Sequence, residues 1–234
     1  MTHNIEKRIN KLKTSGYPKF KSLDSDMHYL LKRFEGEKNH KGFYPKFKQG
    51  EIVFVDFGIN VNKEFSSSHF AIVMNKNDSN TEDIVNVIPL SSKENKKYVK
   101  MNFDLKWEYF FRLFLNLISA QNNTVKLKED FNKKYPEDII TKDFNNEFIL
   151  DTLEVEDKLN EINRSVNNIV SAMDKVKKLK GSSYACVNSF QPISKFRIRK
   201  VLPHKIKNPV IDSSDIMILI NQINNNILQI PDIR

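Results

Sequence analysis

Three short apolar segments decide the fold of this chain. Residues 48–58 read K-Q-G-E-I-V-F-V-D-F-G, residues 68–75 read S-H-F-A-I-V-M-N, and residues 84–93 read I-V-N-V-I-P-L-S-S-K. Each is rich in β-branched or aromatic residues and is bounded by Gly, Asn, Asp or Ser, which is typical of a β-strand. The sequence therefore predicts strands over 52–57, 70–74 and 84–90. The first loop, 58–69, is long for a hairpin, and loops held by a rigid sheet often carry function.

Helical patterns flank these strands. Residues 1–47 predict a short amphipathic helix, followed by a second one from about Ser25 to Phe34. His40 lies in the loop that follows, and no second ligand stands at a zinc-like spacing, so we expect a solvated loop histidine.

The block 103–180 predicts two long helices. The first has an apolar face that we expect to be packed, made of Trp107, Phe110, Phe111, Phe114, Leu117 and Ile118. An aromatic box for a cofactor is the less favoured interpretation. The second has a seam typical of a helix–helix contact, made of Leu159, Ile162, Val166, Ile169, Met173 and Val176, and Gly181 can terminate it. That seam indicates packing on the first helix or, alternatively, dimerisation.

Strand texture returns after Gly181, over 184–188 and 193–201, and a last helix follows that Asp212 or Ser213 can cap. We therefore predict an α+β protein with a helical N-terminal arm (1–47), a small antiparallel β-barrel with a C-terminal helix (48–102 and 181–234), and an inserted helical hairpin (103–180).

Composition limits the choice of function. The 234 residues include 38 Lys+Arg and 29 Asp+Glu, a formal net charge of +9 that favours a polyanionic partner such as nucleic acid. Lys and Asn richness from coding bias is the alternative explanation of that charge. A single cysteine rules out an internal disulfide framework, and neither a signal peptide nor a membrane-spanning run is present. We expect a cytoplasmic protein without membrane contact.

Two segments together resemble the PemK/MazF family of toxin endoribonucleases from bacterial toxin–antitoxin pairs. The first, 48–93, is similar to the family's G-[DE]-[IV] strand, acidic loop residue, Arg-Pro-Ala second strand and Pro-[ILV]-Thr-Ser end of the third strand. The second, 182–202, contains S-Y-A-C-V-N-S-F-Q-P-I-S-K-F-R-I and is similar to the family's late basic strand. The resemblance implies a small antiparallel barrel, a homodimer, an antitoxin partner, single-stranded RNA as substrate and no cofactor or metal.

The chain departs from the family at the positions that matter for catalysis. The family's catalytic arginine falls on His69, the following proline on Phe70, and the catalytic threonine on Ser91. The arginine of the family's late Arg-Thr run is replaced near Gln191 and Pro192. Glu64 matches the acidic loop residue.

The family reaction needs a base for the ribose 2′-hydroxyl, an acid for the leaving oxygen and donors for the phosphorane. Histidine cannot reproduce the arginine fork but can transfer protons. The resemblance thus implies His69 in proton transfer, Ser91 as a phosphate donor, and Glu64 orienting His69 or sharing the proton work. It further implies RNA contacts, namely the cations Lys63, Lys93, Lys195 and Arg197, the polar residues Asn188 and Gln191, and Phe65 or Phe190 stacking on a base.

Each of these residues also has an ordinary structural explanation, such as a strand end for Ser91 or a solvated loop charge for Lys63 and Lys93. Three other functions stay open. The chain could be a catalytically inactive relative that binds RNA or protein, a topoisomerase poison like the CcdB toxins, or a protein whose helical insertion carries the activity.

Overall fold

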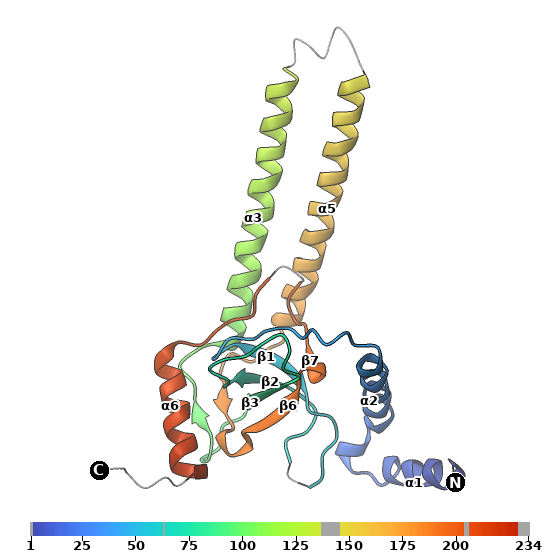
Figure 1. Cartoon of the computed structure of the whole chain (residues 1–234), viewed down its shortest axis with the longest axis vertical. Helices are drawn as coiled ribbons and strands as arrows, with labels where there is room; N and C mark the ends of the chain where they lie inside the picture. Colours follow the sequence, from blue (N-terminus) through green and yellow to red (C-terminus); the bar gives the residue numbers. More distant parts are fainter. Residues whose placement is uncertain (1, 63, 137–145, 204–205, 229–234) are drawn as a thin grey trace. The chain divides into compact units, whose positions relative to one another are not determined.

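The structure is a computed structural model that describes residues 2–62, 64–136, 146–203 and 206–228. The chain forms two compact units (Figure 1). The first consists of residues 1–102, 182–199 and 210–234, and the second of residues 103–181 and 200–209.

The first unit is built on an antiparallel sheet. Its strands are β1 (Ile52–Asp56), β2 (Ser68–Val73), β3 (Ile84–Ser91), β4 (Val99–Lys100), β5 (Tyr184–Ala185), β6 (Gln191–Ser194) and β7 (Ile198–Arg199). The strand order is β4-β5-β3-β2-β1-β7, and β6 also pairs with β3. The three strands predicted from the apolar segments are confirmed within two residues at each end, because their β-branched runs are buried on the sheet.

The sheet is not closed into the predicted barrel. Residues 193–201 were expected to form one strand, but the 3₁₀ turn of Lys195–Arg197 divides them. On one side of that turn β6 pairs with β3, and on the other side β7 pairs with β1. Because the turn takes its residues out of the ladder, the ring of strands stays open at this point.

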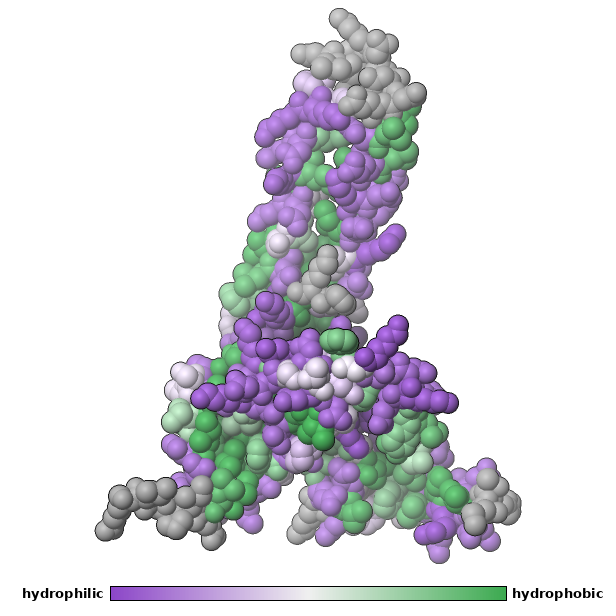
Figure 2. Space-filling model, viewed as in Figure 1, coloured by the Kyte–Doolittle hydropathy of each residue, from purple (hydrophilic) through white to green (hydrophobic). Residues whose placement is uncertain are grey.

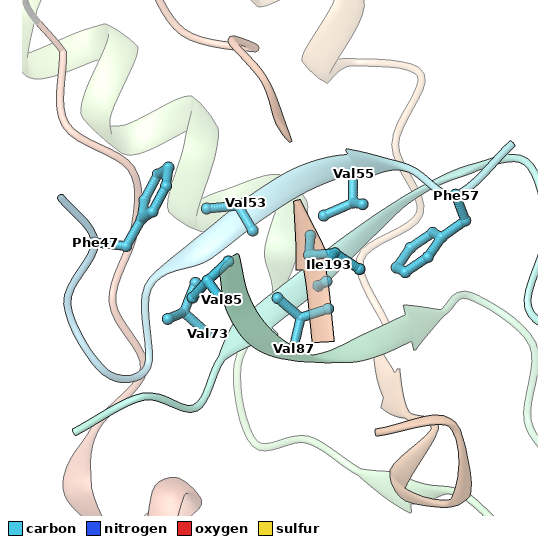
Figure 3. Close-up of a cluster of buried hydrophobic side chains, with 9 residues drawn as sticks. Phe47, Val53, Val55, Phe57, Val73, Val85, Val87 and Ile193 are labelled. Atoms are coloured by element: carbon cyan, nitrogen blue, oxygen red, sulfur yellow. The ribbon is translucent and has the colours of Figure 1, made fainter. Parts of the chain in front are cut away.

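The core of this unit lies between β1, β2, β3 and β6. Alternate residues of the strands point to one side, as the period of two requires. Figure 3 shows their side chains directed toward one another. The cluster consists of Phe47, Val53, Val55, Phe57, Ala71, Val73, Val85, Val87 and Ile193. Burial of these side chains stabilises this face of the sheet.

Helices flank the sheet. The N-terminal helices are α1 (Thr2–Lys13) and α2 (Leu23–Lys38), with a 3₁₀ turn over Pro18–Phe20 between them. The C-terminal helix α6 (Ser213–Ile223) continues into a π-helical turn over Asn224–Leu228. Asp212 caps α6 as predicted, because its Oδ1 accepts a hydrogen bond from the Asp215 N–H at 2.9 Å. Helices α2 and α6 lie on either side of the sheet (Figure 1).

His40 is not the solvated loop histidine that the sequence predicts. Its ring lies 4.2 Å from the Tyr44 ring and 5.0 Å, edge-on, from the Phe196 ring. Its Nε2 is buried without a hydrogen-bond partner. The histidine therefore acts as an aromatic packing residue between the α2–β1 segment and the turn after β6.

The second unit contains an antiparallel helical hairpin of α3 (Leu105–Lys134) and α5 (Asn146–Val176) (Figure 1). The Asp104 carboxylate caps α3 by accepting the Trp107 N–H at 2.9 Å. Gly181 does not terminate α5, which ends at Val176. Its missing Cβ instead leaves room for the Asp104 carboxylate, which a side chain at this position would overlap.

The predicted packed face of α3 is mostly exposed. Trp107, Phe111, Phe114 and Ile118 are exposed and Phe110 and Leu117 are half-buried, whereas the buried residues of the helix are Leu105, Tyr109, Leu113 and Ala120. The periodicity that suggested packing belongs to the side of the helix facing water. None of the helices in the described part of the chain is long and apolar enough to cross a bilayer.

Candidate active site

Several strand ends meet at one end of the sheet. Antiparallel pairing sets Asp56 at the end of β1 opposite Ser68 at the start of β2. It also sets Ser91, at the end of β3, opposite Tyr184 of β5. The loop after β1 and the Lys-rich loop after β3 both leave from this end. A strand end with adjoining loops is a common place for a functional site.

His69 lies at this end, in β2. It is paired with Val55, a core residue, and residues directly opposite in an antiparallel pair share a face of the sheet. The half-buried imidazole lies edge-on to the Phe65 ring at a centroid distance of 4.6 Å. Burial lowers the pKa of His69 from its ordinary value, against hydrogen bonds to the backbone of Leu90 and of Ser66 that raise it. The imidazole is therefore neutral near pH 7 and can accept a proton.

Ser91 lies close to His69 by register. The paired residues of β2 and β3 end at Ala71 and Pro89, and two further residues along each strand lead to His69 and Ser91. The hydrogen bond of the imidazole to Leu90 agrees with this register. The Ser91 hydroxyl accepts the Lys93 N–H at 3.0 Å and donates to the Lys93 carbonyl at 3.2 Å. To donate to a phosphate, the hydroxyl must turn away from that carbonyl.

The Glu64 carboxylate forms a hydrogen bond within its own loop. Its carboxylate accepts the backbone N–H of Val61 at 3.1 Å and so closes the loop between β1 and β2. The groups that orient His69 are instead the backbone of Leu90 and Ser66 and the ring of Phe65. Lys63, the neighbouring predicted RNA contact, lies outside the described residues.

Lys195 and Arg197, the two late basic residues, have different environments in the structure. Lys195 is fully buried, with its Nζ 2.7 Å from Asp78 Oδ1 and 2.9 Å from the Ser79 carbonyl. An ammonium held in this way cannot reach an RNA phosphate, so we remove Lys195 from the candidate site. Arg197 is half-buried and donates to the Phe57 carbonyl at 2.8 Å.

A cluster of arginines that sequence reasoning missed surrounds Asp56. The buried Asp56 carboxylate forms ion pairs with Arg33 of α2 and with Arg199 of β7. Burial and the nearby Arg33 lower the pKa of Arg197, while Asp56 raises it. The one available signal was a carboxylate inside an otherwise apolar run, although nothing in the sequence pairs it with Arg33.

A polar cavity of about 600 Å³ opens beside β4. Its lining consists of Lys96, Lys97, Tyr98, Val99, Asn188, Gln222 and Asn226. Of these only Asn188 was predicted, although the Lys-rich loop was visible in the sequence. Amide side chains can hydrogen-bond nucleobase edges, and lysines can pair with phosphates. The other predicted amide, Gln191, donates its Nε2–H to the Ser189 carbonyl at 3.2 Å.

Lys93 and Phe65, two further predicted RNA contacts, differ in how freely their side chains could reach RNA. Lys93 is exposed, and only its backbone takes part in the Ser91 turn. Phe65 packs edge-on against Phe57 at 5.2 Å as well as against His69. The Phe65 ring thus packs against the imidazole, and only the rest of its surface could contact a nucleobase.

Cys186 is close in sequence to Asn188, which lines the polar cavity, but its thiol is not reactive. Its thiol is buried, and burial raises its pKa to about 11, against a hydrogen bond with Tyr98 that lowers it. A thiol with this pKa is protonated at physiological pH and is a poor nucleophile.

Comparison with known protein families gives a match. Residues 48–115 match the family of PemK-like, MazF-like toxins of type II toxin–antitoxin systems. This confirms the resemblance read from the first segment. The match spans under a third of the chain and includes β1, β2, β3 and the first turns of α3, so both His69 and Ser91 lie inside it. No curated protein matches the chain.

Proposed function

We propose that this protein is a toxin-like endoribonuclease that cleaves single-stranded RNA as the toxin of a toxin–antitoxin pair. The observation that carries the proposal is a half-buried His69, whose pKa is lowered by burial, at a strand end within the segment that matches the PemK-like, MazF-like toxins. The implied homodimer and the antitoxin partner belong to the same proposal.

The charge distribution supports an RNA substrate. Residues 103–181 contain 13 basic and 14 acidic residues, so the remaining chain holds 25 basic and 15 acidic residues. The positive charge is therefore concentrated outside the hairpin, in the part of the sequence that contains His69. A basic surface attracts a polyanion and speeds its association.

In the proposed reaction His69 takes the proton of the ribose 2′-hydroxyl. The 2′-oxygen forms a bond to the adjacent phosphorus, and the bond from phosphorus to the 5′-oxygen breaks. The products are a 2′,3′-cyclic phosphate and a 5′-hydroxyl whose proton comes from solvent. No oxidant or co-reactant is required, and the imidazolium returns its proton to water afterwards.

The surrounding residues have supporting roles in this proposal. Ser91 donates to a non-bridging phosphate oxygen after its hydroxyl leaves the Lys93 carbonyl. Lys93, Arg197 and the cavity lysines Lys96 and Lys97 neutralise flanking phosphates. Asn188 reads a base edge.

The test is an assay of purified protein on a long unstructured RNA, with sequencing of the RNA ends. We expect His69→Ala to lower the cleavage rate by about 10²–10⁴-fold, which is the usual contribution of an acid–base group. His28→Ala, at an exposed position of α2, is the matched control and should cut at the normal rate. Undiminished cleavage by His69→Ala would remove the histidine from the mechanism.

A catalytically inactive RNA-binding module is the second candidate. The observation that favours it is the Ser91 hydroxyl, which is committed to the Lys93 backbone, next to a position where the family arginine is absent. In that case the protein would bind the same RNA and leave its ends unchanged, a result that the same experiment records.

A further inference from the structure

The side of α3 that faces water carries a row of large apolar side chains. Trp107 is 60% exposed, Leu115 is 47% exposed, and Phe111, Phe114 and Ile118 are 44%, 44% and 39% exposed. We call these five residues the α3 row. A band of hydrophobic residues is visible along α3, on the left of the hairpin in Figure 2.

The α3 row is distinct from the packed side of the helix. At about 100° per residue, Trp107, Phe111, Phe114 and Ile118 fall within about 60° of one another. The buried residues Leu105, Tyr109 and Leu113 lie on the opposite side. Helix α3 is thus apolar on two sides, and its own unit covers only one of them. Exposed apolar patches of a few hundred Å² usually mark interaction sites.

The spacing of the row matches a helix–helix seam. Its members Trp107, Phe111, Phe114 and Ile118 are separated by four, three and four residues, which is the alternation of the d and a positions of a heptad. The spacing reads the same in both directions. Two copies of α3 packed antiparallel therefore bring Trp107 opposite Ile118 and Phe111 opposite Phe114, a large ring against a smaller group at each end.

Charge favours a second copy over other occupants. The α3 row contains no ionisable side chain, and residues 103–181 are nearly balanced, with 13 basic and 14 acidic residues. An RNA would gain little electrostatic attraction here, and neither would a strongly acidic protein. Two neutral hairpins, by contrast, can approach without the repulsion that the basic remainder of the chain would produce.

We propose that the α3 row is a homodimer interface, in which a second copy of this chain packs its own α3 antiparallel through the same residues. The contact is isologous, so one two-fold axis passes between Phe111 and Phe114 of the two helices. This inference rests on the homodimer included in the proposed function and assigns its contact to the hairpin, while the ribonuclease activity itself does not require this surface.

The available area fits a weak dimer. A buried aromatic side chain contributes about 150–250 Å², so at these exposed fractions the row offers on the order of 400–500 Å² per copy. Two copies together then bury close to the ~1,000 Å² at which specific interfaces begin. We therefore expect an equilibrium between monomer and dimer that depends on concentration.

The only tryptophan in the chain lies in the row and reports on it directly. Sedimentation of the full-length protein, across the micromolar concentration range, should show a dimer forming. The Trp107 emission should shift to shorter wavelength over the same range, because the ring leaves water. A chain that stays monomeric, or a dimer whose Trp107 emission is unchanged, would overturn the proposal.

Charge variants test the register. Phe111→Lys alone and Phe114→Glu alone should each weaken the dimer by at least about tenfold, because each buries an unpaired charge at the centre of the contact. An equal mixture should recover a heterodimer, because the positive charge of Phe111→Lys in one copy then faces the negative charge of Phe114→Glu in the other. At the second contact, the unchanged Phe114 and Phe111 face each other. Leu153→Lys, at a 53% exposed position of α5, is the matched control and should leave the dimer unchanged.

The mixture separates a dimer through α3 from any dimer formed elsewhere. If both single variants remain dimeric, the copies meet through another surface and the proposal fails. If both become monomeric and the mixture stays monomeric, the antiparallel register is wrong. Circular dichroism of each variant verifies that the helices are retained.

Discussion

Two opposing effects set the pKa of the His69 imidazole. Burial beside Phe65 lowers its pKa, and hydrogen bonds to the backbone of Leu90 and Ser66 raise it, with burial the larger effect. Because the net shift is downward, the neutral form persists to lower pH than in a free histidine. In the proposed reaction, a proton acceptor therefore takes the place that the resemblance assigns to the family's arginine.

A pH–rate profile tests this assignment. We expect kcat/KM for RNA cleavage to fall on the acid side with a midpoint below about 6.5, because protonated His69 cannot accept the 2′-hydroxyl proton. Because the pKa of His69 is lower in the folded than in the unfolded chain, the unfolded chain binds the proton more tightly. The stability contributed by His69 is therefore lost as pH falls below about 6.5. The residual activity of His69→Gln should no longer fall at acid pH. If the fall persists in the variant, it belongs to another titrating group.

The buried pair of Lys195 and Asp78 makes a second residue-scale prediction. Its charges are fully shielded from water, and Asp78 also accepts the Phe47 N–H at 2.8 Å. Lys195→Met leaves the carboxylate without its cation, so we expect the free energy of unfolding in urea to fall by about 3–5 kcal/mol. The control Lys97→Met, at an exposed position, should change it little. An equal loss in both variants would contradict a structural role specific to Lys195.

At the scale of elements, α3 depends on the space left by Gly181. A Cβ at this position would overlap the Asp104 carboxylate that caps the helix. We therefore expect Gly181→Ala to displace the cap and destabilise the protein by about 1 kcal/mol, the usual value of an N-cap. Thermal unfolding measures the change. Asp104→Ala should cost a similar amount and the double variant little more, because both remove the same cap; full additivity would refute the coupling.

The elements differ in how far the sequence could predict them. Runs such as Ile52–Asp56 are short, β-branched and bounded by turn residues, so local chemistry is enough to find them. The apolar period of α3 identified a helix correctly, but a helix with two apolar sides does not reveal which one is packed. The resemblance implied Lys195 as an RNA contact, and the sequence could not reveal its buried partner Asp78, which lies more than a hundred residues earlier in the chain.

The candidate site shows the same division. The family pattern identified His69 and Ser91, because they lie in the strands that carry the match. It could not identify Lys96, Gln222 and Asn226, which line the polar cavity from segments far apart in the sequence. It also could not foresee Arg33 beside Asp56, a pairing between α2 and β1 that only the packed fold creates.

For the whole molecule, the separation of charge makes a quantitative prediction about RNA binding. Lys96→Gln/Lys97→Gln removes two charges from the cavity beside β4, and Lys126→Gln/Lys128→Gln removes two from α3. We expect only the first pair to lower the dependence of log affinity on log salt, by up to about 1.4, since each phosphate contact on a single strand contributes about 0.7. Fluorescence anisotropy over a salt series measures both. Equal effects of the two pairs would show that RNA contacts the hairpin as well.

The buried thiol of Cys186 has a practical consequence. With a pKa near 11 and no exposure to solvent, it should resist maleimides and iodoacetamides that react readily with accessible thiolates. A cysteine introduced at an exposed position, such as Lys93→Cys, would then be modified alone while the native residue is kept. A single dye could thus be attached next to the Ser91 turn, and its signal would follow the arrival and departure of the proposed substrate strand in real time.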